Sequence, residues 1–245
     1  MITGIYKEAQ RRGIRRLCHF TPSRQLFPIL RSGAILATKY LEDDSRAVYH
    51  PSDLQRLDGF KDHVCCSIEY PNTWYFRRAQ AGEVNFPEWV VLLLRPAYLW
   101  MEGVKFCPRN ASASSGRLIA GGEVAFQRLY ANQITGAYGR VYHRTVNHLP
   151  YCPTDDQAEV LIPGVIPRTD ILAIAVASED QARMEYHRLR LLLPQAGIPF
   201  DIPPLVVAPH MYDPGMLRQA ISTGRRPIEL AWEAKPPATK PSVTR

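Results

Sequence analysis

The sequence predicts an α+β fold, and three observations carry this prediction. The apolar segments that resemble strands are short, and long irregular pieces separate them. A doubly wound parallel sheet would instead show strands alternating regularly with helices. No glycine-rich phosphate loop follows any of these segments, which argues against the Rossmann and P-loop architectures. With 245 residues, of which 46% are hydrophobic, the chain is long enough for one domain with a sizeable core.

Five segments are predicted to be strands because each is short, apolar and bounded by polar or turn-forming residues. They are residues 16–21, 64–68, 89–94, 159–162 and 171–177. The third is an almost continuous apolar run, which is typical of a strand buried on both faces.

Four helices are predicted, three of them from residues that begin or end helices. They are a short helix over residues 26–30 that stops at Gly33, a second over about residues 123–132, a third that Ser178 caps with Gln181 at the capping-box position, and a last one that opens at Asp213-Pro214. Residues 39–58 are polar and predicted to be irregular, and residues 107–122 are predicted to form a mobile loop. Residues 234–245 are predicted to be a disordered tail, which leaves 1–233 as a single domain.

The formal net charge is +7, and arginine dominates it, with 24 arginines against 6 lysines. Arginine binds phosphates through two-point contacts and stacks on flat rings. The charge is therefore compatible with a nucleic-acid or pyrophosphate ligand, and equally with an ordinary solvated surface.

Several classes of protein are not indicated. No run of eighteen apolar residues occurs, so no membrane span is expected, and no secretory signal is recognised at the amino terminus. The five cysteines are scattered and odd in number, which favours free thiols in a reducing compartment such as the cytoplasm. None of them has zinc-site spacing, so no metal site is predicted.

Glu159 is the first candidate for chemistry, because it begins an apolar strand directly after a polar loop. Gln157 lies two residues earlier and would share its side of the strand if the strand extends that far. Together a carboxylate and an amide could hold a sugar hydroxyl and a base edge. A strand-end glutamate in solvent is the competing interpretation.

Three further segments could contact a ligand, although each could equally be structural. His19, Phe20 and Thr21 end the first predicted strand, where the histidine could fix a ribose or an amide. Arg56 is a natural partner for a pyrophosphate, and Arg46 is its nearest rival. A run of three aromatic residues and two arginines suits base stacking with phosphate contacts, or else a core anchor. It comprises Trp74, Tyr75, Phe76, Arg77 and Arg78.

The order of these pieces resembles one family, the DarT-type DNA ADP-ribosyltransferases, which are the toxins of toxin–antitoxin pairs. The resemblance runs over about residues 17–174, and its most specific parts are residues 18–33 and 154–162. It implies a split β-sheet with NAD in a cleft between two small sheets. It also implies an enzyme that consumes NAD as a substrate and modifies a base in single-stranded DNA, because a base in a duplex is stacked and poorly reachable.

The resemblance also assigns roles to individual residues. Glu159 would be the catalytic glutamate, and Arg56 would grip NAD and complete the catalytic pair. His19, Phe20 and Thr21 would line the NAD site. The side chains expected at the DNA are Trp74, Tyr75, Arg77, Arg78 and Gln157. The Pro71-Asn72 segment looks more like the branch that modifies guanine than the branch that modifies thymine, and Gln157 agrees with this loosely.

A toxin of this family implies an antitoxin partner with ADP-ribosyl hydrolase activity. Two other functions compete with the DNA enzyme. The first is an ADP-ribosyltransferase that modifies RNA or protein. The second is a nucleic-acid-binding relative whose NAD cleft has lost activity.

Overall fold

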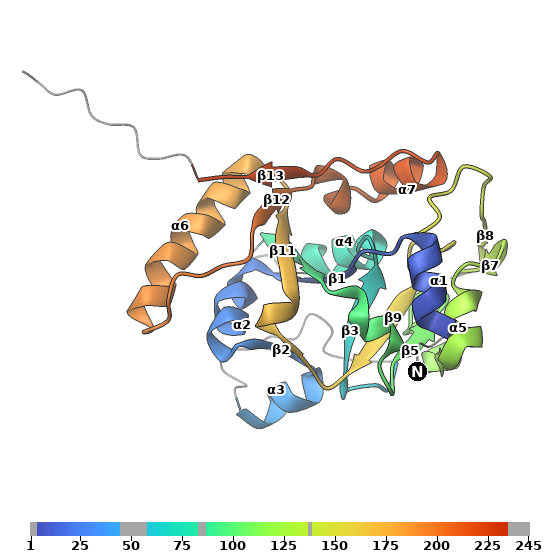
Figure 1. Ribbon diagram of the computed structural model, residues 1–245, viewed down its shortest axis with the longest axis horizontal. Coiled ribbons are helices and arrows are strands. Elements are labelled where there is room, and N and C mark those ends of the chain that lie inside the picture. Colours follow the sequence, from blue (N-terminus) through green and yellow to red (C-terminus); the bar gives the residue numbers. More distant parts are fainter. Residues whose placement is uncertain (1–3, 45–57, 83–86, 137–138, 235–245) are drawn as a thin grey trace, which may run out of the picture.

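The computed structural model describes residues 4–44, 58–82, 87–136 and 139–234, and it has the predicted α+β architecture. A central sheet runs through the molecule and helices lie around it (Figure 1). Helix α6 lies at one end of the molecule, and the hairpin of β7 and β8 lies at the other.

The central sheet has nine strands in the order β13-β12-β11-β4-β1-β3-β9-β5-β6. Their bounds are β1 Leu17–Pro22, β3 His63–Ile68, β4 Trp89–Leu94, β5 Lys105–Cys107, β6 Ala120–Gly121, β9 Glu159–Pro163, β11 Ile171–Val176, β12 Leu205–Val207 and β13 Leu230–Trp232. Two small antiparallel sheets accompany it. They pair β2 (Ala34–Leu36) with β10 (Val165–Pro167), and β7 (Gln133–Thr135) with β8 (Val141–His143).

The central sheet splits between β1 and β3. Strand β3 pairs with β9 over His63–Cys66, but it pairs with β1 only through Ser67 and Ile68. Strand β1 stays paired with β4 along its whole length. The second half of β1 and the first half of β3 therefore diverge and leave backbone and side chains facing an opening. This is the split sheet that the family resemblance implies.

Seven α-helices surround the sheet within the described residues. Their bounds are α1 Gly4–Arg12, α2 Leu26–Ser32, α3 Thr38–Asp44, α4 Thr73–Ala81, α5 Gly122–Arg128, α6 Glu179–Gln195 and α7 Pro214–Ser222. Short 3-10 helices lie at η1 Ser23–Gln25, η2 Pro96–Trp100, η3 Ala113–Gly116, η5 Arg168–Asp170 and η6 Pro209–Tyr212.

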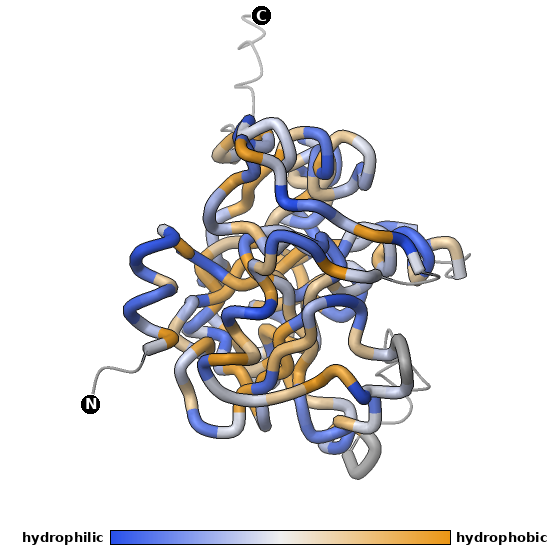
Figure 2. The backbone as a smooth tube through the Cα atoms, turned by 90° about the vertical axis from the view of Figure 1, so that its right-hand side faces the viewer, coloured by the Kyte–Doolittle hydropathy of each residue, from blue (hydrophilic) through white to orange (hydrophobic). Residues whose placement is uncertain are grey.

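The hydrophobic core lies along the central strands. All six residues of β4 are buried, as the continuous apolar run predicts, and Phe76, Phe106 and Phe126 are fully buried against the sheet region. Figure 2 shows this arrangement as apolar colour in the interior and hydrophilic colour on peripheral helices such as α1.

All five predicted strands are confirmed within a residue or two of their ends. The helix ends that the sequence signals are also confirmed. Gly33 ends α2 at a φ of 81°, a conformation that glycine adopts without strain. Ser178 accepts a hydrogen bond from the Gln181 amide, and Asp213 accepts one from the Met216 amide.

Three predictions about irregular or helical segments need correction. Helix α3 occupies the first part of the segment predicted to be irregular, and residues 45–57 lie outside the described residues. The loop predicted over residues 107–122 contains η3 and β6, and α5 ends at Arg128 rather than near residue 132. Of the tail predicted to be disordered, residues 235–245 also lie outside the described residues.

Candidate active site

Glu159 begins β9 at the point where the sheet splits, and its carboxylate is held by three donors. The side-chain amides of Asn72 and Asn110 donate to Oε1 at 3.0 and 3.2 Å, and the backbone amide of Ala111 donates to Oε2 at 3.0 Å. The residue is only 8% exposed. The carboxylate is therefore preorganised, and the competing interpretation of a glutamate in bulk solvent is wrong.

The two asparagines reach Glu159 from different elements. Asn72 is the N-cap of α4, where its Oδ1 accepts a hydrogen bond from the Tyr75 amide at 3.1 Å while its amide group donates to Glu159. Asn110 comes from the loop that follows β5, a strand that pairs Cys107 directly with Glu159. Helix capping and sheet register thus fix the carboxylate from both sides.

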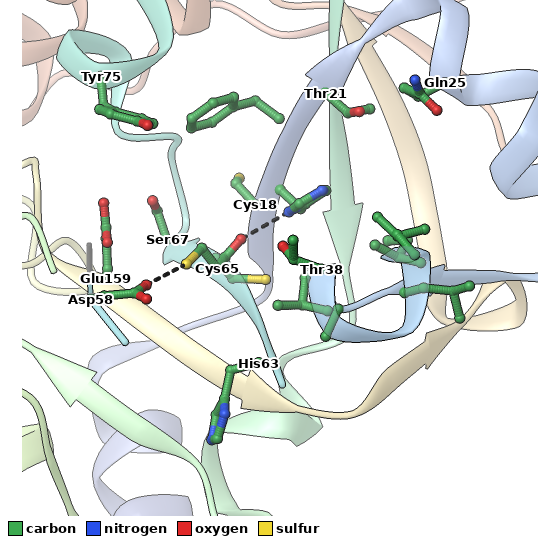
Figure 3. Close-up of a pocket in the computed structure, with 18 of the residues that line it drawn as sticks. Cys18, Thr21, Gln25, Thr38, Asp58, His63, Cys65, Ser67, Tyr75 and Glu159 are labelled. Atoms are coloured by element: carbon green, nitrogen blue, oxygen red, sulfur yellow. Dashed lines mark hydrogen bonds between the residues drawn. The ribbon is translucent and has the colours of Figure 1, made fainter. Parts of the chain in front are cut away.

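The side chain of His19 bridges the split in the sheet. Its Nδ1 donates to the carbonyl oxygen of Cys65 at 2.8 Å, a bond that joins β1 to the diverging half of β3 (Figure 3). A carbonyl can only accept, so Nδ1 carries the proton, and the orientation of the ring is fixed. The side chains of His19, Phe20 and Thr21 line the cleft beside this bond.

The cleft between the diverging strands opens to solvent, and together with the open space at its mouth it comprises about 1050 Å³. Its two ends differ chemically, with Glu159, Asp58 and Tyr75 on one side of the view and Gln25 on the opposite side (Figure 3). Cys18, Cys65 and Ser67 lie between these ends (Figure 3), and the segment from α2 to α3 adds an aliphatic group to the lining, Ile29, Ile35, Leu36, Ala37 and Leu41, together with Thr38. Such a cavity suits an elongated ligand with one polar reacting end and one flat or apolar end.

Three cysteines line the cleft, and two of them are inert. Burial raises the pKa of the Cys18 thiol to about 12 and raises the pKa of Cys66 well above its ordinary value. Both remain protonated near neutral pH and are poor nucleophiles. Cys65 donates from Sγ to the Asp58 carboxylate at 3.6 Å. The preorganised group best placed for chemistry is therefore the Glu159 carboxylate.

Residues 18–213 match the family model described as ssDNA thymidine ADP-ribosyltransferase, DarT. The chain belongs to this family. The resemblance seen in the sequence is confirmed, and with it the assignment to an enzyme family that ADP-ribosylates single-stranded DNA. No curated protein matches the sequence.

Solved structures of similar fold come from the DarT family. Thermus sp. 2.9 DarT in complex with NAD+ has 18% identity and a TM-score of 0.53, covering 81% of this chain and 97% of that chain. The complex with ADP-ribosylated ssDNA has 16% identity and a TM-score of 0.53, covering 82% and 97%. Thermosipho africanus DarTG in complex with ADP-ribose has 14% identity and a TM-score of 0.54, covering 81% of this chain and 51% of that chain. These likenesses confirm the fold.

The aromatic and arginine residues predicted to contact DNA lie on α4, a helix that the sequence analysis does not predict. Trp74 is 41% exposed, and Arg77 and Arg78 are exposed. Tyr75 lines the cleft. Phe76 is fully buried, and its ring centre lies 5.2 Å from that of Phe20, on which it stacks. Phe76 is therefore a core anchor, as the competing interpretation of this segment expects.

Of the two remaining predicted site residues, the structure places Gln157 and does not describe Arg56. Gln157 lies in a turn before β9, so the strand does not extend to it, and it is not among the residues that line the cleft. The expected alternation with Glu159 is therefore wrong. Arg56 and its rival Arg46 lie outside the described residues.

Two further sequence predictions concern absences. Among the residues that the structure describes, no three His, Cys, Asp or Glu side chains are grouped to hold a metal ion. None of the helices in that part of the chain is long and apolar enough to cross a membrane.

Asp155, four residues before Glu159, is fully buried, and its Oδ1 accepts a hydrogen bond from the backbone amide of Gln157 at 2.9 Å. Burial raises its pKa from 3.8 to about 7. A carboxyl group with a raised pKa in the folded state stabilises the protein fully below its unfolded pKa, and this contribution is lost as the pH rises through the folded pKa.

Asp155→Asn should therefore stabilise the protein at pH 8 more than at pH 5. The asparagine keeps the acceptor for Gln157 but carries no buried charge. With ~1.4 kcal/mol for each unit of pKa, the extra gain at pH 8 should be ~2 kcal/mol. Urea unfolding at both pH values measures it. Asp201→Asn is the matched control, since Asp201 is exposed and its ion-pair partner is an arginine, a side chain that does not titrate between these pH values. Equal gains at both pH values would mean that Asp155 is not protonated in the folded protein.

Proposed function

We propose that this chain transfers ADP-ribose from NAD to a base in single-stranded DNA, with Glu159 as the catalytic carboxylate. The observation that supports this most directly is the position of Glu159. It is a buried carboxylate at the split of the sheet, aligned by Asn72, Asn110 and the Ala111 amide at one end of a long cleft.

Because the two ends of the cleft differ, NAD would bind in one orientation. The nicotinamide and its ribose would lie at the end with Glu159 and Tyr75, with the fixed ring of His19 beside Cys65, whereas Thr21 lies toward Gln25 (Figure 3). The adenosine would lie at the aliphatic end, with Gln25 and Thr38 as polar groups. Phe20, which also lines the cleft, is held in place by its packing on Phe76. Arg56 stays the predicted partner of the pyrophosphate.

Glu159 would act on the bond between nicotinamide and C1 of its ribose. As this bond breaks, nicotinamide leaves with the electron pair and positive charge develops on the sugar, as in glycoside hydrolysis. A fixed carboxylate stabilises that charge most in the transition state, because there the charge is largest. The acceptor nitrogen of the base then bonds to C1, and its proton passes to Glu159 as general base.

The direct test is incubation of the protein and NAD with separate pools of single-stranded DNA, RNA and protein. Nucleoside mass spectrometry should find ADP-ribose on DNA, with release of nicotinamide. Modification confined to RNA or protein would transfer the assignment to another ADP-ribosyltransferase. Binding of DNA without release of nicotinamide would identify an inactive relative.

We infer guanine as the acceptor base, on the Pro71-Asn72 segment that departs from the aromatic segment of the thymine-modifying branch. The family description names thymidine, so the two bases should be tested directly against each other. An oligonucleotide with guanine as its only base capable of modification should be labelled from NAD. One that replaces this guanine with thymine should be a poor acceptor. Equal or stronger labelling of the thymine oligonucleotide would reverse the assignment.

We also propose an antitoxin partner, on the basis of the family to which the chain belongs. We expect a protein with ADP-ribosyl hydrolase activity that removes the modification from DNA. Expression of this chain together with such a hydrolase should relieve damage to growing cells. No relief, with hydrolase activity demonstrated on the modified DNA, would contradict the expected pairing.

A further inference from the structure

Four side chains from three distant parts of the sequence form a ladder in which rings and guanidinium groups alternate. The Arg218 guanidinium carbon of α7 lies 5.1 Å from the ring centre of Trp74 on α4 and 4.7 Å from that of Tyr142 on β8. The guanidinium carbon of Arg140 lies 5.4 Å from the ring centre of Tyr142, so Arg140 forms the end of the row opposite Trp74. We call Trp74, Arg218, Tyr142 and Arg140 the stacked ladder.

Asp156 fixes the centre of the stacked ladder. Its carboxylate accepts two hydrogen bonds from Arg218, at Oδ1 and Oδ2, and a third from the Trp74 indole at 3.1 Å. The two-point ion pair neutralises Arg218, so this guanidinium contacts both rings as a paired group rather than as a free cation. The rings are thus held at fixed positions before any ligand arrives.

The stacked ladder is accessible and has a cationic margin. Trp74 is 41% exposed, and Arg140 at the opposite end is exposed. Arg77 and Arg78 follow Trp74 by three and four residues, which places them on the same face of α4. Both are exposed. The two exposed ends of the stacked ladder and the exposed arginines beside it combine stacking surfaces with charges for phosphates, while Tyr142 between them is half-buried.

The stacked ladder is joined to the catalytic end of the cleft by two short connections. Asp156 lies three residues before Glu159, in the turn that leads into β9. Trp74 is next to Tyr75, which lines the cleft, and it shares α4 with the capping residue Asn72. A strand of DNA whose acceptor base enters the cleft would therefore pass over these rings.

We propose that the stacked ladder is the platform on which the nucleotides next to the acceptor base stack. This inference rests on the proposed function, and it adds Arg140 to the predicted DNA contacts. Bases stack on aromatic rings and on arginine planes whatever their sequence, and single-stranded DNA supplies unpaired bases. Arg218 and Tyr142 are positioning residues, whereas Trp74 and Arg140, at the two exposed ends, contact the bases.

The experiment compares short and long oligonucleotides. The test variants are Tyr142→Leu and Trp74→Leu, which remove a ring but keep an apolar side chain, and Tyr142→Phe, which keeps the ring. Tyr186→Leu is the matched control, because Tyr186 packs against Phe200 and Trp232 at the α6 end of the molecule (Figure 1). The measurements are KM for a trinucleotide and for a longer acceptor, and the affinity for a labelled single strand by fluorescence anisotropy.

Lengthening the acceptor should lower the KM of the wild-type protein, and Tyr142→Leu or Trp74→Leu should remove most of this gain. Affinity for the long strand should fall roughly tenfold in either variant, the effect of one base stack lost directly with Trp74, or through Arg140 when Tyr142 no longer positions it. Tyr142→Phe and Tyr186→Leu should behave like the wild type. Equal KM changes for both acceptor lengths, or none, would overturn the proposal. If the wild-type protein modifies no DNA, the proposed function fails instead, and the anisotropy measurement still tests the stacked ladder.

Discussion

Glu159→Gln should slow transfer of ADP-ribose to DNA by about a hundredfold or more, while NAD binding changes little. One preorganised charged group is commonly worth ~3 kcal/mol of transition-state stabilisation, which corresponds to this factor. The sugar carries positive charge only as its bond to nicotinamide breaks. Loss of the carboxylate charge should therefore reduce kcat far more than it weakens the affinity for NAD.

The structure decides how this variant must be controlled. A glutamate facing open water would contribute little to folding, but Glu159 is buried and accepts hydrogen bonds from Asn72, Asn110 and Ala111. Glu159→Ala would leave these donors without their acceptor, at a cost of ~1–3 kcal/mol each if water does not replace it. Glutamine keeps the volume and one acceptor oxygen. It is therefore the more informative change.

Transfer rate, NAD affinity by calorimetry and melting temperature should be measured together for Glu159→Gln. Glu102→Gln is the control, because Glu102 is exposed on a turn. A folded Glu159→Gln protein that binds NAD and transfers ADP-ribose at near wild-type rate would refute the proposed mechanism. A parallel loss of NAD binding would instead assign Glu159 to ground-state recognition.

The sequence predicted those parts of the site that local patterns mark. Glu159 stands where a polar loop meets an apolar strand, and His19 and Thr21 stand at the end of another strand, so their positions follow from strand periodicity. Asn110 lies in a segment of small residues that resembles an ordinary loop. Only the pairing of β5 with β9 brings it to Glu159, and that pairing joins residues far apart in the chain.

The missed helices have a different explanation. Helix α4 has only Thr73 and Phe76 buried, and its exposed aromatic and arginine residues hide the helical period. Its signal is Asn72, a strong N-cap residue directly before Thr73. Likewise, the stacked ladder joins α4, β8 and α7, and no spacing in the sequence predicts such a contact.

Asn72→Asp should reduce transfer at neutral pH by about one to two orders of magnitude and make it strongly dependent on pH. Asp and Asn are equally good N-cap residues, so the hydrogen bond to the Tyr75 amide and the start of α4 should survive. The amide that donates to Glu159 is replaced by a carboxylate at about the same 3.0 Å. Two buried carboxylates at this distance cannot both ionise readily and tend to share a proton.

The pH profile distinguishes this effect from a structural one. Catalysis needs the Glu159 carboxylate ionised, so the activity of Asn72→Asp should keep rising with pH where the wild-type profile is already flat. Asn72→Ser is the matched variant, because serine also caps helices but adds no charge. Its rate should fall less than that of Asn72→Asp, and its pH profile should resemble the wild type. If both variants lose the same activity with unchanged pH profiles, Asn72 acts only as the cap of α4, and other groups, among them Asn110 and Ala111, align Glu159.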